Sequence, residues 1–164
     1  MGQLRRRCEQ RVRALAVPRP FDLVTFCAHV EGLRGRRLEL KPMPGLSAAA
    51  PCGMWLSVPD ADYVLYEPNT SQLHSEHIIL HELAHMLCDH RLSMDTSVLR
   101  KLMPSISPAV VRRVLGRVDY ATEQEQEAEM LASLIRGTAG MRGERDALSR
   151  ITEVFGPHTG PTHT

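Results

Sequence analysis

The sequence has few aromatic residues, little net charge and no long apolar run. Phe, Trp and Tyr make up only 4% of its 164 residues, so a core must consist mainly of aliphatic side chains. The net charge of +1 argues against nucleic-acid binding by the whole domain. No run approaches the roughly 18 apolar residues of a membrane span, and the charged stretch LRRRCEQRVRAL near the N-terminus is unlike a secretion signal. We therefore expect a cytoplasmic protein without direct nucleic-acid or membrane partners.

Cysteine is also scarce and scattered. The four cysteines, at positions 8, 27, 52 and 88, form no CxxC pair, which argues against a disulfide framework or a cysteine zinc knuckle. The 43% hydrophobic content is ordinary for a globular protein. We expect one domain over residues 1–156, with N-terminal helices in 3–34, a core in 36–136 and a disordered tail at 157–164. The basic helix at the N-terminus has the composition of a solvated face, and its role stays open.

The pattern of apolar residues predicts an α+β chain that is mostly helical. We expect helices at 3–16 and, after an N-cap at Asp22, at 23–34. A half-buried strand is predicted at 36–44, and a hairpin whose strands, Met54–Val58 and Tyr63–Tyr66, flank the turn PDAD. Further helices are predicted from about Ser75 and at 108–117, 122–137 and 143–155. The strands should form a small antiparallel sheet.

Residues 77–90 read HIILHELAHMLCDH and contain the arrangement HExxH. His81 and His85 are one helical turn apart, so both imidazoles can reach one zinc ion. Glu82 points elsewhere around the helix and can act as general base toward a water on the metal. The helix is apolar on nearly all sides, which predicts burial, and buried histidines need partners. The stretch therefore predicts a zinc site with Glu82 as the catalytic residue.

A catalytic zinc site needs a third protein ligand and an open fourth position. The pattern with a third histidine shortly after HExxH is absent, which leaves a carboxylate from the helix at 122–137. The inward stripe of that helix should be Ala128, Leu131, Ala132 and Ile135, and Glu125 lies on the same stripe. We expect Glu125 to be the third ligand, with Glu127 as the second candidate and Glu123 as the third.

Several neighbouring residues have weaker claims. His77 and Cys88 lie one turn before and after the ligand pair, where packing is the ordinary role. Asp89 could orient a ligand imidazole. Tyr120 could stabilise an oxyanion, although packing is more common, and His90 is expected at a helix end.

The chain resembles the ImmA/IrrE family of zinc metallopeptidases. The resemblance is carried by HIILHELAHMLCDH, by the tryptophan-bearing hairpin before it and by EQEAEMLASLI after it, in which Leu131 stands where the family usually has an aromatic residue. It implies a zincin-like domain with His81, His85 and Glu125 as zinc ligands and Glu82 as catalytic base. It also implies an intracellular, site-selective protease whose substrate is often a helix-turn-helix repressor of a stress, mobile-element or toxin–antitoxin response.

Two hypotheses from different classes follow. The first is a zinc endopeptidase that binds an extended segment of a partner protein along the edge of the hairpin. The second is a zinc-stabilised regulatory or toxin–antitoxin interaction module with little turnover. A structural zinc site needs no base beside its ligands, so Glu82 favours the first hypothesis. A DNA-binding role for residues 94–117 is disfavoured, because prolines separate the helices of that stretch.

Overall fold

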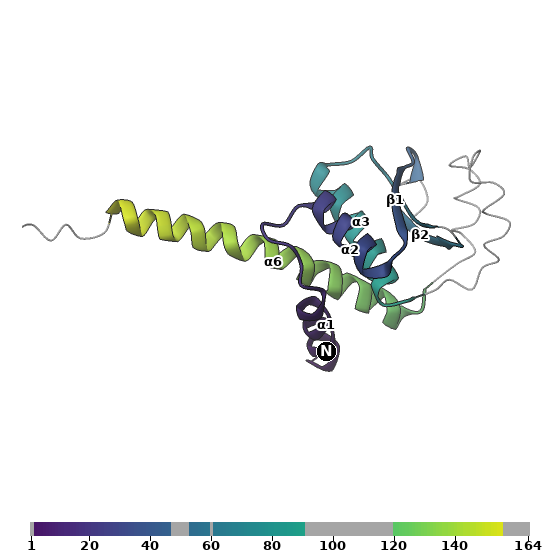
Figure 1. Cartoon of the computed structure of the whole chain (residues 1–164), viewed down its shortest axis with the longest axis horizontal. Coiled ribbons are helices and arrows are strands. Elements are labelled where there is room, and N and C mark those ends of the chain that lie inside the picture. Colours follow the sequence, from purple (N-terminus) through teal and green to yellow (C-terminus); the bar gives the residue numbers. More distant parts are fainter. Residues whose placement is uncertain (1, 47–52, 60, 91–119, 156–164) are drawn as a thin grey trace, which may run out of the picture.

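A computed structural model describes residues 2–46, 53–59, 61–90 and 120–155. It has the α+β, mostly helical architecture that the sequence predicts (Figure 1). The elements, in chain order, are α1 (Gly2–Leu15), α2 (Leu23–Arg34), β1 (Arg37–Pro42), β2 (Gly53–Val58), β3 (Ala61–Tyr66), α3 (Gln72–Leu87) and α6 (Thr122–Phe155).

The three strands form a mixed sheet in the order β1-β3-β2. β2 and β3 make the predicted antiparallel hairpin, in which Val58 pairs with Ala61. β1 runs parallel to β3, so the expectation of a purely antiparallel sheet is wrong. β3 is buried along most of its length and takes the centre of the sheet, and β1 joins the edge of β3 that the hairpin leaves open. β1 alternates charged and apolar residues, which suits an outer strand.

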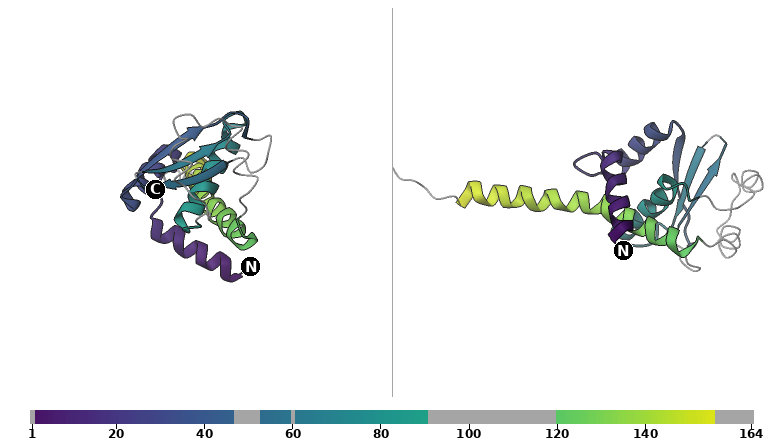
Figure 2. Two further views of the ribbon diagram at one scale, coloured as in Figure 1. Left: turned by 90° about the vertical axis from the view of Figure 1, so that its right-hand side faces the viewer. Right: turned by 90° about the horizontal axis from the view of Figure 1, so that it is seen from below.

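The helices are layered on this sheet. α3 packs against β2 and β3, α6 packs against α3, and α1 packs against α6 (Figure 2). One apolar cluster joins these layers, with Trp55 and Val64 from the sheet and Leu80 and Leu83 from α3 among its members. The predicted inward stripe of α6 is confirmed, because Ala128, Leu131, Ala132 and Ile135 are all fully buried. This packing fixes which side of α6 faces α3.

The helix ends follow capping chemistry. The Asp22 cap is confirmed, since its carboxylate accepts a hydrogen bond from the backbone N–H of Thr25 at 2.8 Å. α3 begins at Gln72, earlier than predicted, because the Ser71 hydroxyl caps it by accepting from the N–H of His74.

The last helix also differs from the prediction. α6 is continuous over residues predicted as two helices, because no proline interrupts them, and its C-terminal half projects from the other elements (Figure 1). The helix predicted at 108–117 and the tail at 157–164 lie outside the described residues. Within the described part of the chain, no helix combines the length and apolar character that crossing a membrane requires.

Candidate metal centre

The structure brings His81, His85 and Glu125 together. His81 and His85 project from α3, and their Nε2 atoms lie 3.0 Å apart. Glu125, near the start of α6, places Oε2 3.3 Å from His81 Nε2 and Oε1 3.3 Å from His85 Nε2. Two imidazole nitrogens and a carboxylate thus converge on one point, and these three residues could hold a metal ion.

The three candidate carboxylates of α6 lie at different places around the helix and have different contacts. Glu125, the first candidate from the sequence, contacts both histidines of the HExxH motif. Glu127 lies on the neighbouring side of the helix and contacts His90 instead, with 3.2 Å between Oε2 and Nε2. Glu123 lies in the first turn of α6 and is not among the groups that could hold a metal. The buried stripe of α6 therefore turns Glu125 toward the two histidines.

Burial decides the protonation state of His85. The residue has no exposed surface, and burial together with the neighbouring His81 and His90 lowers its pKa to about 3. The imidazole is consequently neutral at physiological pH. A neutral imidazole has one nitrogen with a free lone pair, which is the form that binds a metal.

Glu82 lies beside this group, against β2. Its side chain is 4% exposed, and burial with a smaller contribution from the charge of Glu125 raises its pKa to about 8, although the backbone N–H of Trp55 donates to it. Gly53 allows this close approach: a Cβ there would lie 2.7 Å from Cγ2 of Ile78 and 3.0 Å from Oε1 of Glu82. Within the described residues, Glu82 Oε2 is buried without a hydrogen-bond partner.

Tyr120, in the segment just before α6, covers the other side of His85. The two rings are stacked, with centroids 3.7 Å apart and an angle of 12° between their planes. Burial raises the pKa of the tyrosine, so its hydroxyl stays protonated. Like Glu82 Oε2, this hydroxyl is buried without a partner in the part of the chain that the structure describes. A buried polar atom without a partner costs about 1–3 kcal/mol, so two at one place indicate a site built for something other than stability.

Both histidines of the motif have a second polar contact. Nδ1 of His81 lies 3.3 Å from Oε2 of Glu129, and Nδ1 of His85 lies 3.1 Å from Nδ1 of His90. The sequence does not predict these contacts, because no motif singles out Glu129 among the acids of α6 and His90 is expected only at a helix end. Spacing offered one signal, since Glu129 follows Glu125 by one helical turn. His77 contacts Glu129 at 3.2 Å and does not join the ligand group.

A cavity of about 460 Å³ reaches the group from the side of α1 and α6. Its lining includes His81, Glu125, Leu4 and Met130. Two of the three candidate ligand side chains can therefore be approached from this cavity. A second group of possible metal-binding side chains, Cys88, His90 and Glu127, lies next to the first.

Comparisons with protein-family models, with curated proteins and with solved structures found no match. What the site can do must therefore be argued from its own geometry.

Proposed function

We propose that this chain is a zinc-dependent endopeptidase that acts in the cytoplasm on a partner protein. The observation that carries the proposal is the convergence of His81, His85 and Glu125. Next to them lies the buried carboxyl group of Glu82, whose Oε2 has no hydrogen-bond partner among the described residues. The resemblance to the ImmA/IrrE family suggests a helix-turn-helix repressor as the substrate.

Zinc fits the three side chains. Ligand atoms of a tetrahedral ion bound at 2.0–2.1 Å lie about 3.3 Å from one another. Here the two imidazole nitrogens are 3.0 Å apart, and each lies 3.3 Å from a different oxygen of Glu125. One ligand atom from each of the three residues lies within 4.8 Å of the other two. Imidazole nitrogens with one carboxylate oxygen are a donor set that suits zinc, and three protein ligands are typical of its catalytic sites. When bound, zinc would act as a Lewis acid that lowers the pKa of water and polarises a carbonyl group.

Glu82 and Tyr120 have the chemistry that peptide hydrolysis requires of the protein. Burial raises the pKa of Glu82 to about 8 in the metal-free chain, and the charge of a bound zinc ion would lower it, so that the carboxylate could take a proton from the attacking water and deliver it to the leaving amine. Tyr120 has a protonated hydroxyl that can donate to the oxygen of the carbonyl as charge develops there. Both groups border His85 or Glu125 rather than the outer surface.

β2 offers a place for an extended substrate segment. It is an outer strand of the sheet that the structure describes, and its Trp55 N–H donates to Glu82. A peptide added beside β2 would be bound through main-chain hydrogen bonds and would lie next to the proposed base. Trp55 itself packs in the core, with its indole on Asp62, so it is not available as a side-chain contact for substrate.

The test is hydrolysis of a random-sequence quenched peptide library, read by fluorescence and by mass spectrometry of the products. We expect cleavage by the zinc-loaded chain, loss of cleavage after removal of metal with a chelator, and recovery when zinc is added back. Cleavage that a chelator does not affect would contradict a metal site. A chain that holds zinc but cleaves neither the library nor a helix-turn-helix repressor would support the alternative of a zinc-stabilised interaction module.

A further inference from the structure

A continuous chain of polar contacts leads from His85 to the N-terminal helix. His85 Nδ1 lies 3.1 Å from His90 Nδ1, and His90 Nε2 lies 3.2 Å from Glu127 Oε2. Glu127 Oε1 accepts no hydrogen bond within the described residues, but it has two ion-pair contacts, at 3.3 Å from Nε of Arg7 and at 3.9 Å from Nε of Arg11. His85, His90 and Glu127 are all buried. We call His90, Glu127, Arg7 and Arg11 the support chain.

The positions of the protons determine which group donates each hydrogen bond of the support chain. His85 Nε2 faces the other two ligand atoms and must keep a free lone pair to bind a metal. Its proton is then on Nδ1 and is donated to Nδ1 of His90. The proton of His90 is consequently on Nε2 and is donated to the Glu127 carboxylate. Every donor in this arrangement has an acceptor.

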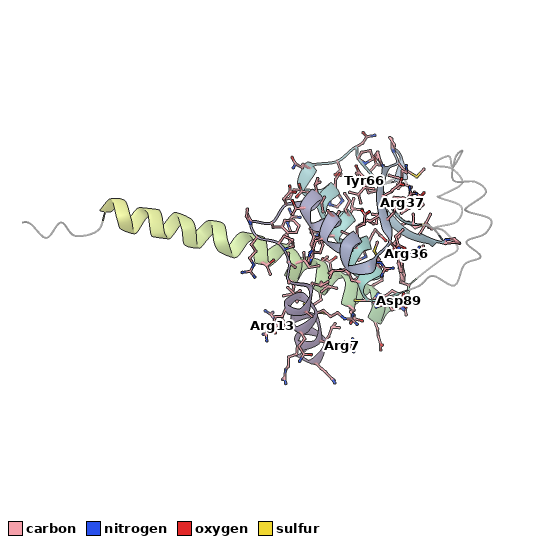
Figure 3. All side chains as sticks on the ribbon, in the orientation of Figure 1. Arg7, Arg13, Arg36, Arg37, Tyr66 and Asp89 are labelled. Atoms are coloured by element: carbon pink, nitrogen blue, oxygen red, sulfur yellow. The ribbon has the colours of Figure 1, made fainter. Side chains whose placement is uncertain are left out.

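The end of α3 is built to bring His90 back to His85. The N–H of His90 donates to the carbonyl of His85 at 2.9 Å, and the N–H of Asp89 donates to the carbonyl of Met86 at 3.1 Å. This is a Schellman motif, with Asp89 in the left-handed conformation at φ 55°. Asp89, labelled in Figure 3 just beyond α3, thus turns the chain so that the His90 ring meets His85.

The N-terminal helix holds the other end. Arg7 and Arg11 neutralise Glu127, and Arg11 also donates to the carbonyl of Leu87 at the end of α3. Cys8 packs between them, with its Sγ 3.8 Å from the backbone oxygen of Glu127. The basic residues of α1 therefore include two with inward partners, in addition to those on the solvated face.

We propose that His90 and Glu127, held by Arg7 and Arg11, are positioning residues for the metal ligand His85. The support chain fixes the tautomer and the orientation of His85, so α1 contributes to metal affinity although it supplies no ligand. This inference rests on the proposed metal site at His81, His85 and Glu125. Hydrogen-bonded partners of metal-binding histidines typically contribute about 10–100-fold in affinity.

The same proton count excludes metal at both groups at once. If His90 bound a second ion through Nε2, its proton would move to Nδ1 and be donated to His85. His85 would then carry its own proton on Nε2, where the first ion should bind. Glu127 also already has two guanidinium partners, which disfavour a cation beside it. Cys88, His90 and Glu127 are therefore not a second metal site in the metal-loaded protein.

The test measures zinc affinity by competition with a chromophoric chelator, together with the absorption spectrum of the cobalt(II)-loaded chain. We expect His90→Phe, which keeps ring volume but has no acceptor, to bind zinc roughly 10–100-fold more weakly and to alter the cobalt spectrum. His90→Gln retains an acceptor and should recover part of the affinity. The double variant Arg7→Gln/Arg11→Gln should lose less than His90→Phe.

Two controls distinguish failure of the positioning role from failure of the proposed metal site. Arg13 is on the same helix but lines a separate cavity with Val17 and Leu134, so Arg13→Gln should bind zinc as the wild type does (Figure 3). Wild type and Cys88→Ser should each bind one zinc per chain. Equal zinc affinity in wild type, His90→Phe and His90→Gln would overturn the positioning role alone. A second zinc lost in Cys88→Ser would also overturn it, whereas a wild type that binds no zinc would overturn the proposed function as well.

Discussion

Asp62 in the sheet and Glu82 on α3 are both buried carboxylates, but their surroundings are opposite. Asp62 is 1% exposed and accepts from Nε of Arg34 at 3.0 Å and from the indole N–H of Trp55 at 3.2 Å. Burial would raise its pKa, but hydrogen bonds from Ser57 and Trp55 and the charge of Arg34 outweigh that effect and lower it. Glu82 has an oxygen without a partner in the described residues and a raised pKa.

The difference teaches how to tell a structural acid from a functional one in this fold. The partners of Asp62 come from α2, β2 and the connection before β1, so the carboxylate joins those elements. Glu82 has a backbone partner on β2 and an oxygen left over beside a group that could hold a metal. Complete partnering indicates a role in stability, and the unused oxygen indicates a role in chemistry.

The largest expected effect is on catalysis. Glu82→Gln should lower the rate of peptide hydrolysis by about 10²–10⁴-fold, because an amide cannot accept the proton of the attacking water. Asp62→Asn should leave the rate per folded, zinc-loaded molecule unchanged. The measurement is turnover of the peptide library under identical zinc loading. Equal losses in the two variants would erase the distinction between these acids.

Stability should show the reverse order. Asp62→Asn should lower the free energy of unfolding by about 2–3 kcal/mol, because Arg34 and Arg36 lose their anionic partner. Glu82→Gln should change it by less than about 1 kcal/mol, since Glu82 forms no ion pair with the residues that the structure describes. Urea unfolding of the metal-free variants gives both values. A larger loss in Glu82→Gln than in Asp62→Asn would contradict this account.

Gly53 tests how tightly β2 and Glu82 are packed. Gly53→Ala should destabilise the chain by about 1–3 kcal/mol, because the added carbon would meet Ile78 and Glu82 at 2.7–3.0 Å. Gly137→Ala is the matched control: no atom lies within 4 Å of its added carbon, and the helix should gain up to about 1 kcal/mol. Thermal or urea unfolding of both variants measures this, and a neutral Gly53→Ala would show that the strand can move away.

The smallest expected effect is the loss, at low pH, of the stability that Asp62 contributes. The folded-state pKa of Asp62 lies below the ordinary 3.8. Its contribution to stability is therefore fully present above about pH 4 and is lost as the pH falls through the folded value. The stability difference between wild type and Asp62→Asn should shrink between about pH 4 and pH 2. A difference that stays constant over that range, measured by urea unfolding, would mean that Asp62 titrates normally.

Local signals in the sequence predict which side chains of α3 meet. His81 and His85 are four residues apart and therefore share a helix face, and their Nε2 atoms lie 3.0 Å apart, while Glu82 stays the proposed base. The stripe of α6 favoured Glu125 for the same reason, and Leu131 and Ala132 confirm that stripe. Both predictions rest on spacing within a single helix and do not depend on how α3 and α6 pack together.

What the sequence missed depends on distant pairings. The sequence predicts a turn at PDAD, yet its last residue, Asp62, is within β3 and accepts a hydrogen bond from Arg34 of α2. β1 was expected in an antiparallel sheet, and only its pairing with β3 makes it parallel. His90 meets Glu127, 37 residues away, only because the turn at Asp89 and the packing of α6 coincide.

X-ray absorption at the zinc edge of the zinc-loaded protein is the most direct measurement of the central claim. The account predicts one zinc per chain with nitrogen and oxygen neighbours at about 2.0–2.1 Å and no sulfur, as His81, His85 and Glu125 would give. A sulfur neighbour at about 2.3 Å would place the metal with Cys88, His90 and Glu127 instead. That result, or a protein that takes up no zinc, would contradict the account.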